Sequence, residues 1–405
     1  MNILLLTSEF APATGGIGTY AREIAAAASA LGADVTVVAP DYAGDTAALD
    51  LSLPFKVRRF HGGLHSMKGL PSKIKLTRHL VGAKRYDIVH AADWPFFIPV
   101  ALSRGLTPAR IVMTVHGTEI NETQTTLKRL AIRMAGVFGP RTEIAANSRY
   151  TGGLFLERFA VDAARIHPIW LGVSDFWFGP RGKRAATRAA HGIAADRIVM
   201  VTVARITRRK GHSAAFNALS TLPGALRAKI TWLIIGPDGE DDYVKELRRI
   251  VAVTDCDIRF LGAMADEKIR DIYGAADFFC LTGMPDSSGR VEGFGLVYLE
   301  AAACGLPSVA TAIGGVPEAV LADETGLVVP PSIDEIARAI IELTEDNDTR
   351  SVLAAGASAH ARALSWERCA AETYNLPRSG KRAIGAAPSD TPAAVQQAIS
   401  PAWTA

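Results

Sequence analysis

The chain has 405 residues, of which 49% are apolar and 21% are charged, and its formal net charge is +3. A chain of this length is too long for one ordinary hydrophobic core, so we expect two domains of roughly 150–200 residues each. The composition excludes a fibre, a collagen and a disordered chain. The four cysteines form no CxxC pair, which indicates reduced thiols, a cytoplasmic protein and no cysteine-bound metal.

Short apolar, β-branched segments alternate with longer amphipathic segments along the whole chain. This alternation is typical of parallel strands joined by crossover helices and predicts an α/β fold. The apolar start, MNILLLTSEF, lacks a basic front and is shorter than a membrane span, so we expect a buried strand there. We expect further strands in the first half near residues 34–39, 86–91, 110–116, 143–147 and 166–172. In the second half we expect strands near residues 198–204, 230–236, 258–262, 277–281, 307–311 and 326–329.

The two series of strands predict two doubly wound sheets, in domains that span residues 1–172 and 173–364. Between them the sequence GVSDFWFGPRGKR is rich in Gly, Pro and charge, and we place the linker at about 172–184. We expect a helix over 365–377 to return to the first domain. Residues 378–405 are mostly small residues and Pro, which predicts a disordered tail.

A glycine-rich turn, SEFAPATGGIGTYARE, follows the first strand and places Gly15, Gly16 and Gly18 before a helix. Glycines at this position let a backbone approach an anion, with amides at the start of the helix directed toward it. A tight turn that needs positive φ explains the same residues without a ligand. The spacing is not GxGxxG, which argues against a dinucleotide-binding domain.

Basic residues are concentrated in residues 51–86, where nine lysines and arginines occur with no Asp or Glu. This segment predicts either a solvated helix face or a surface for an anionic membrane or acceptor, and no nucleic-acid module accompanies it. A second basic helical stretch, LKRLAIRMAGVFGPR, spans residues 127–141 and could add anchoring at an interface. The candidate acceptor or membrane residues are Lys73, Lys75, Arg78, Lys128 and Arg129.

Two strand ends carry further polar candidates. His116 ends the strand RIVMTVHG and is a candidate for contact with sugar hydroxyls, although a purely structural histidine is also possible. In IVMVTVARITRRKGH, Arg205 ends a strand and Lys210 precedes the next helix. Two cations at the carboxyl end of a strand suit a diphosphate leaving group. The alternative is that they only cap a loop, and Arg208 and Arg209 complicate the choice.

The segment GRVEGFGLVYLEAAACG is the most informative in the chain. Glu292 precedes a glycine turn, whereas Glu300 lies inside an apolar helix, where a carboxylate needs a partner. The glycines place Glu292 on a loop and Glu300 on the helix, so the two acids could hold different parts of one ligand. The amides of Phe294, Gly295 and Leu296 would face its phosphates.

Together these residues resemble the retaining glycosyltransferases of family 4, which have the two-domain GT-B fold. The resemblance covers about residues 1–376 and rests on GGIGTY, the His after TV, ARITRRKG, the Glu-x7-Glu segment, GGVPEAV and GLVVPP. It implies transfer of a hexosyl group, mannosyl or glucosyl, from a GDP- or UDP-linked donor to a lipid-linked or surface-polysaccharide acceptor, with retention at the anomeric carbon. It also implies no cofactor and no metal.

The resemblance implies a role for each matched residue. Arg205 and Lys210 would bind the donor diphosphate, Glu300 would hold the ribose, and Glu292 would contact the transferred sugar. His116 would lie over that sugar, and Gly16 would lie beside the phosphates and acceptor. The backbone from Leu261 to Met264 would cradle the base. The leaving phosphate would accept the acceptor's proton on the same face of the sugar, so the protein contributes positioning and charge stabilisation.

Two features of the sequence depart from the family pattern, and a third favours one group within the family. The run from Leu171 to Asp175 replaces a common Asn-Gly-Val-Asp, which puts a linker contact with the ligand in doubt. Ala13 stands where glycogen and starch synthases carry a lysine, which argues against an ADP-glucose donor. The loop from Met284 to Arg290 is most similar to that of mannosyltransferases acting on lipid acceptors.

Two other functions fit the same architecture. A nucleotide-sugar epimerase would convert the donor without an acceptor. A non-catalytic nucleotide-sugar-binding protein would bind tightly without turnover, and the presence of both acids and both cations disfavours it.

Overall fold

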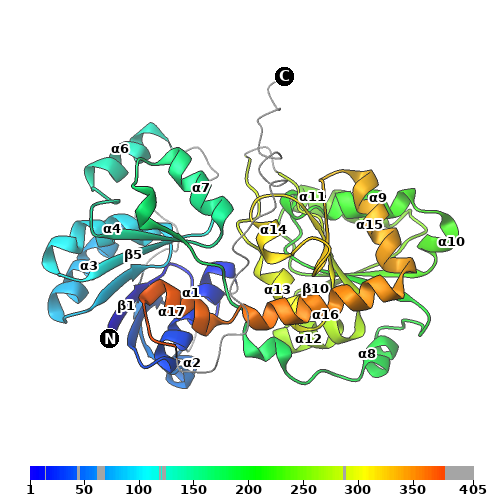
Figure 1. Ribbon diagram of the computed structural model, residues 1–405, viewed down its shortest axis with the longest axis horizontal. Coiled ribbons are helices and arrows are strands. Elements are labelled where there is room, and N and C mark those ends of the chain that lie inside the picture. The colour runs from blue at the N-terminus through cyan, green and yellow to red at the C-terminus, as the bar shows by residue number, and fades with distance from the viewer. Residues whose placement is uncertain are drawn as a thin grey trace.

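Figure 1 shows the computed structural model, in which two α/β domains lie side by side. The structure describes residues 1–13, 15–42, 46–61, 69–117, 120, 125–285 and 289–378. The expected tail beyond residue 378, Lys68 of the basic segment and part of the loop from Met284 to Arg290 lie outside these ranges.

The first domain contains a parallel sheet of seven strands in the order β3-β2-β1-β4-β5-β6-β7. Its first strand is buried on both faces, which is why its sequence is apolar throughout rather than alternating. Ile3 and Leu5 pack with Tyr20 on one face, while Leu4 and Leu6 pack with Leu80 on the other. The strands are β1 (Asn2–Leu6), β2 (Asp34–Pro40), β3 (Lys56–Phe60), β4 (Ile88–Ala91), β5 (Arg110–Val115), β6 (Thr142–Ala146) and β7 (Ile166–Pro168).

The second domain contains a parallel sheet of six strands in the order β10-β9-β8-β11-β12-β13. In both sheets the order reverses beside the first strand of the domain, which creates the switch point where doubly wound folds bind ligands. The strands are β8 (Ile198–Val203), β9 (Ile230–Ile235), β10 (Asp257–Gly262), β11 (Phe278–Leu281), β12 (Ser308–Thr311) and β13 (Gly326–Val329).

The helices cover both faces of each sheet. In the first domain they are α1 (Gly16–Ala30), α2 (Ala47–Ser52), α3 (Leu70–Ala83), α4 (Phe97–Ser103), α6 (Thr126–Met134) and α7 (Arg149–Arg158). In the second they are α8 (Arg184–Ala190), α9 (His212–Thr221), α10 (Gly224–Arg227), α11 (Asp241–Val251), α12 (Asp266–Ala275), α13 (Leu296–Ala303), α14 (Val316–Ala319), α15 (Ile333–Glu345) and α16 (Asn347–Ala363). Short 3-10 turns are η2 (Trp94–Phe96), η3 (Arg104–Leu106), η4 (Ala163–Arg165), η5 (Asp175–Phe178) and η6 (Arg208–Lys210).

The α/β class and the two separate sheets expected from the sequence are confirmed. The sequence reading missed β3, which lies at the edge of the first sheet inside the basic segment. It also extended the strand at 166–172 too far, because β7 ends at Pro168.

The last helix in the described part of the chain returns to the first domain. Figure 1 shows α16 running beside the second domain toward the first, where α17 (Trp366–Tyr374) packs against α1. The hydroxyl of Tyr374 is 2.8 Å from Nδ1 of the buried His90, and Nε2 of His90 is 2.7 Å from Oγ1 of Thr114. Burial lowers the pKa of His90 to about 3, so its ring is neutral. The domain boundaries themselves stay a prediction.

One carboxylate of the second domain binds the first domain directly. Glu318 of α14 accepts hydrogen bonds from the amides of Arg149 and Tyr150, at 2.8 and 3.0 Å, where α7 begins. It also accepts one from Nε1 of Trp170 at 2.6 Å. A carboxylate at a helix N-terminus satisfies amides that have no partner within the helix. Glu318 therefore ties the domains together.

Candidate active site

Glu292 forms a compact ion cluster in the second domain. Nζ of Lys210 lies 2.5 Å from Oε2 of Glu292, and Nη1 of Arg209 lies 3.4 Å from the same atom. Burial alone would raise the pKa of Glu292, but the charges of Lys210 and Arg209 outweigh it and hold that pKa below its ordinary value. The cluster consists of two cationic side chains that both pair with one ionised carboxylate.

The chain takes a sharp course after Glu292 because glycines allow it. Gly295 caps α13 with a φ of 98°, a conformation that residues with a Cβ rarely adopt. A Cβ at that position would lie 3.4 Å from Cγ of Glu292. Phe294 is buried, Leu296 opens the helix, and the amides here form the N-terminal end of α13. Their position beside the cations suits an anionic ligand.

Glu300 lies on α13 in a very different environment. Burial and the negative charges of Asp266 and Glu23 raise its pKa from 4.5 to about 8. Asp266 follows the segment Leu261–Met264, and Glu23 belongs to α1 of the first domain. Among the described residues we find no hydrogen bond from the Glu300 carboxyl, so this half-buried group is available to a ligand that carries hydroxyls.

The two domains meet beside Glu292. Backbone of the first domain approaches so closely that a Cβ on Gly293 would lie 2.0 Å from the carbonyl oxygen of His116, and a Cβ on Gly117 would lie 3.0 Å from Cα of Gly293. His116 is half-buried, its Nε2 is 2.8 Å from the carbonyl oxygen of Ala92, and its ring packs against Tyr20. Asn147 donates to the His116 carbonyl at 3.0 Å. The structure therefore brings His116 next to the Glu292 loop.

Two residues from the expected donor site are placed differently from the rest. Arg205 is exposed at the end of β8, and Arg209 rather than Arg205 contacts Glu292. Gly16 opens α1, but the carboxylate of Glu9 lies over the start of this helix and accepts from the amide of Gly18 at 3.0 Å. An acidic side chain at this helix start disfavours a phosphate there unless Glu9 moves.

The basic candidates of the first domain divide into buried and exposed side chains. Lys73 is only 3% exposed, lies over the ring of Phe96, and has its pKa lowered by burial, so it cannot be part of a membrane-facing surface. Lys75, Arg78 and Arg129 are exposed, and Lys128 is half-buried. Other charges of the segment pair with acids outside it, such as Arg59 with Asp50 at 2.6 Å, which the segment's own composition could not reveal.

A buried polar pair lies at the carboxyl ends of β1 and β4, and the sequence reading missed it. The amide of Ser8 donates to Oδ2 of Asp93 at 2.8 Å, and the Ser8 hydroxyl binds the same oxygen. Both residues are essentially inaccessible to solvent. The signal was available, since Ser8 ends the first predicted strand and Asp93 follows the strand predicted at 86–91, on the side where α/β folds bind ligands.

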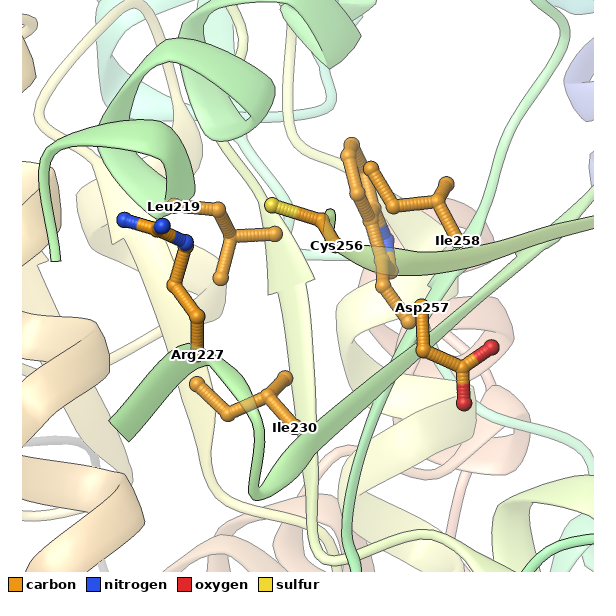
Figure 2. Close-up of a pocket in the computed structure, with 7 residues that line it drawn as sticks. Leu219, Arg227, Ile230, Cys256, Asp257 and Ile258 are labelled. Atoms are coloured by element: carbon orange, nitrogen blue, oxygen red, sulfur yellow. The ribbon is translucent and has the colours of Figure 1, made fainter. Parts of the chain in front are cut away.

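The depression in Figure 2 is not this site. It is lined by residues that include Ile230, Asp257 and Ile258, which stand at the beginnings of β9 and β10. Ligand sites of parallel sheets lie at the opposite, carboxyl ends of the strands. Within the described part of the chain, no three His, Cys, Asp or Glu side chains gather as metal ligands would.

Comparison with known proteins gives the family. Residues 183–360 match the family model described as glycosyl transferases group 1, and residues 14–175 match glycosyltransferase family 4. The chain is 30% identical to a GDP-mannose-dependent alpha-(1-6)-phosphatidylinositol monomannoside mannosyltransferase of Mycolicibacterium smegmatis, over 85% of this chain and 89% of the relative. It is 28% identical to a GDP-mannose-dependent monoacylated alpha-(1-6)-phosphatidylinositol monomannoside mannosyltransferase of Corynebacterium glutamicum, over 94% of this chain and 98% of the relative.

A solved structure agrees on the fold. Anabaena Alr3699/HepE in complex with UDP and glucose superposes with a TM-score of 0.73 at 22% identity, covering 92% of this chain and 99% of that chain. The GT-B fold expected from the sequence is thereby confirmed. The chain belongs to the group 1 glycosyl transferases, with a first half of the family 4 type, and it is a glycosyltransferase.

Proposed function

We propose that this enzyme transfers a mannosyl group from GDP-mannose to a phosphatidylinositol-based glycolipid, with retention at the anomeric carbon and at a membrane surface on the cytoplasmic side. The observation that carries the chemistry is the cluster of Lys210, Arg209 and Glu292 beside the contact between the two domains. The mannosyltransferases among its relatives support the choice of donor and acceptor.

In this proposal the chain's cations replace a metal ion at the leaving group. Lys210 and Arg209 balance the charge of Glu292 before the donor arrives, so a diphosphate with its larger charge can share them. Arg205 is exposed and close enough along the chain to join them when the donor binds. The amides at the start of α13 add further donors, and we expect no cofactor.

Each carboxylate then has its own part of the donor. Glu300 lies on α13, apart from the two cations, and accepts hydrogen bonds from the ribose hydroxyls. Glu292, at the domain contact, lies against the transferred sugar, with His116 on the opposite side. Exclusion of water by the contact between Gly117 and Gly293 favours transfer over hydrolysis.

The acceptor side is the carboxyl edge of the first sheet. Ser8, Asp93 and Lys73 lie buried beneath this edge, so they hold its shape and do not contact a headgroup. The exposed Lys75, Arg78 and Arg129, with Lys128, give the same domain a basic exterior suited to an anionic membrane.

The test is to incubate purified protein with a panel of nucleotide sugars and with phosphatidylinositol-containing lipid extract. We expect a mannolipid product only with GDP-mannose, and an α linkage by NMR. Product from UDP-glucose alone would overturn the donor assignment, and release of free sugar without any transferred product would overturn the acceptor.

The same experiment addresses the two alternatives. An epimerase would change the sugar of the donor without lipid, which NMR of the donor alone detects. The relatives of this chain named above are glycosyltransferases, so they give the epimerase alternative no support. A binding protein without catalysis would show saturable donor binding and no turnover.

A further inference from the structure

A row of buried polar side chains crosses the first domain from α17 to the candidate active site. The hydroxyl of Tyr374 on α17 lies 2.8 Å from Nδ1 of His90, and Nε2 of His90 lies 2.7 Å from Oγ1 of Thr114. The hydroxyl of Tyr20 lies 2.8 Å from the same Thr114 oxygen. All four residues are at most 2% exposed. We call these four residues the buried row.

The buried row ends at His116. The rings of Tyr20 and His116 meet edge to face, with 4.9 Å between their centroids and an interplanar angle of 77°. Because aromatic pairs prefer this arrangement, the Tyr20 ring favours one orientation of the imidazole. Tyr20 also meets Trp366 of α17, with 6.0 Å between the ring centroids. Helix α17 thus reaches Tyr20 through a ring contact and, by way of Tyr374, through hydrogen bonds.

The strands that carry the buried row also carry a second restraint on His116. His90 lies on β4 and Thr114 on the adjacent β5, and Ala92 and His116 each follow two residues later. Side chains two residues apart in a strand point to the same face. Nε2 of His116 donates to the carbonyl oxygen of Ala92 at 2.8 Å. A shift between His90 and Thr114 would therefore move both the ring that packs on His116 and the carbonyl that holds it.

The direction of the hydrogen bonds makes Tyr374 the group that fixes the row. Burial lowers the pKa of His90 to about 3, so its ring is neutral, and one nitrogen donates while the other accepts. Among the described residues the Tyr374 hydroxyl has no other hydrogen-bond partner, and a buried phenol that donates to nothing is costly. Tyr374 therefore donates to Nδ1, and Nε2 donates to Thr114. Without this hydroxyl, no partner at Nδ1 selects the tautomer of His90.

We propose that Tyr374 and His90 are positioning residues for the transfer reaction, and that through Thr114 and Tyr20 they hold the His116 ring against the sugar site. A buried network whose members are paired has one arrangement, so His116 is presented in one orientation. The inference rests on the proposed function for the part that places His116 beside the transferred sugar. The orientation of the ring itself can be measured without any reaction.

Two variants break the buried row at different points. Tyr374→Phe removes only the hydroxyl on α17, and Thr114→Val replaces a hydroxyl by a methyl group of similar size. Thr114→Ser keeps the hydroxyl and is the conservative variant. Leu376→Ala is the matched control, because Leu376 is 9% exposed, packs in the same apolar core as Tyr20 and follows α17 without joining the row. Thermal melts check that all four variants fold.

The direct measurement is a heteronuclear NMR spectrum of donor-free protein with isotopically labelled histidine. The chain has nine histidines, and the His116 signal is the one that His116→Gln removes. We expect Tyr374→Phe and Thr114→Val to shift this signal, because the Tyr20 ring changes the magnetic field at neighbouring protons. Thr114→Ser and Leu376→Ala should leave it in place.

An unmoved His116 signal in Tyr374→Phe would overturn the proposal, and so would an equal shift in Leu376→Ala. If Tyr374→Phe does not fold, the comparison of Thr114→Val with Thr114→Ser decides by the same criterion.

Kinetics test whether the effect reaches the reaction. Tyr374→Phe should lower kcat by about tenfold and change KM for GDP-mannose by less than about twofold, since the donor contacts stay and only the placement of His116 changes. In the His116→Gln background the same substitution should have no further effect on kcat. A loss that is equally large without His116 would mean that Tyr374 acts by another route, which overturns the proposal.

The two readouts separate this proposal from the proposed function. If wild type transfers no mannose to lipid, the proposed function fails, and the spectra still decide whether the buried row orients His116. If the spectra change as expected while kcat stays at the wild-type value, the row shapes the domain alone and the positioning role is overturned.

Discussion

Glu292 and Glu300 lie eight residues apart, yet their surroundings move their pKa values in opposite directions. Two cations stabilise the ionised form of Glu292, whereas burial and two nearby carboxylates favour the neutral form of Glu300. The same residue type therefore has two chemical states near neutral pH in the absence of donor. This difference fits one carboxylate among charged groups and one among hydroxyls.

Lys210→Ala should lower kcat by about 10²–10³-fold, because it removes a cation aimed at the leaving diphosphate. The measurement is the rate of transfer at saturating donor. Arg208→Ala is the matched control, since Arg208 is the neighbouring cation but is exposed and pairs with Glu246 instead. Equal losses in the two variants would argue against a specific role for Lys210.

Glu300→Gln should make thermal stability less dependent on pH. The folded protein holds a proton on Glu300 up to about pH 8, while the unfolded chain releases it near its ordinary pKa of 4.5. Stability from this group is therefore complete at low pH and is lost as pH rises from about 4.5 to 8.

The melting temperature of Glu300→Gln minus that of wild type should then increase between pH 5 and pH 8.5, measured without donor. The exposed Glu342, changed to Gln, serves as the control and should give a constant difference. A constant difference for Glu300→Gln as well would mean that the carboxyl is ionised in the folded protein.

The sequence predicted several residues of the site but not how they contact one another. Glu292, Lys210 and Glu300 could be selected because charges at strand ends and inside an apolar helix need an explanation. Arg209 could not be preferred over Arg205, because that choice depends on side-chain direction after β8. Glu9 was missed, since only the folded turn shows its carboxylate over the start of α1.

At the scale of elements, β3 shows why one strand escaped prediction. Its sequence, KVRRF, carries three charged residues, with Lys56 and Arg58 exposed and Val57 and Arg59 half-buried, and charged residues are common on edges. In the sequence these charges predict either a solvated helix face or a surface for an anionic membrane or acceptor. The central strands were recognised because burial on both faces makes them continuously apolar.

The contact between α14 and α7 can be tested through Glu318→Ala. Loss of the carboxylate leaves two amides of α7 and Nε1 of Trp170 without this acceptor, which should cost about 1–2 kcal/mol of stability. Because Glu318 is also a link between domains, kcat should fall as well. Thermal melts and transfer rates measure the two effects.

The matched control is Ser332→Ala, which removes the cap of α15 within the second domain. It should lower stability by a similar amount and leave kcat unchanged. If Glu318→Ala also kept its full kcat, the contact would serve stability alone.

At the scale of the whole molecule, residues 1–378 cross between the two domains twice, and the second crossing ends in α17. This helix covers α1 and supplies the Tyr374 hydroxyl to the buried His90. The first domain is thus completed by residues that follow the second domain in sequence. The return of a helix over 365–377 was expected from the sequence, but its buried partners depend on packing that no local pattern reveals.

A chain that ends after Leu364 should therefore lose the first domain's stability, because α1 would be exposed and His90 would lose a partner. A chain that ends after Arg378 should keep the melting temperature of the full protein. Circular dichroism melts of both truncations measure this. A normal melt for the shorter chain would show that α17 is dispensable.

Gly117 and Gly293 set how near the two domains can come. Neither position has room for a methyl group when the backbones touch, so the smallest side chain at either one would act as a spacer between the lobes. Substitution at this pair would change the distance between the two domains without altering Glu292, Lys210 or Glu300. Residues of graded size at Gly293 would hold the lobes apart by graded amounts, whereas at Gly117 the φ of 104° adds backbone strain to any side chain.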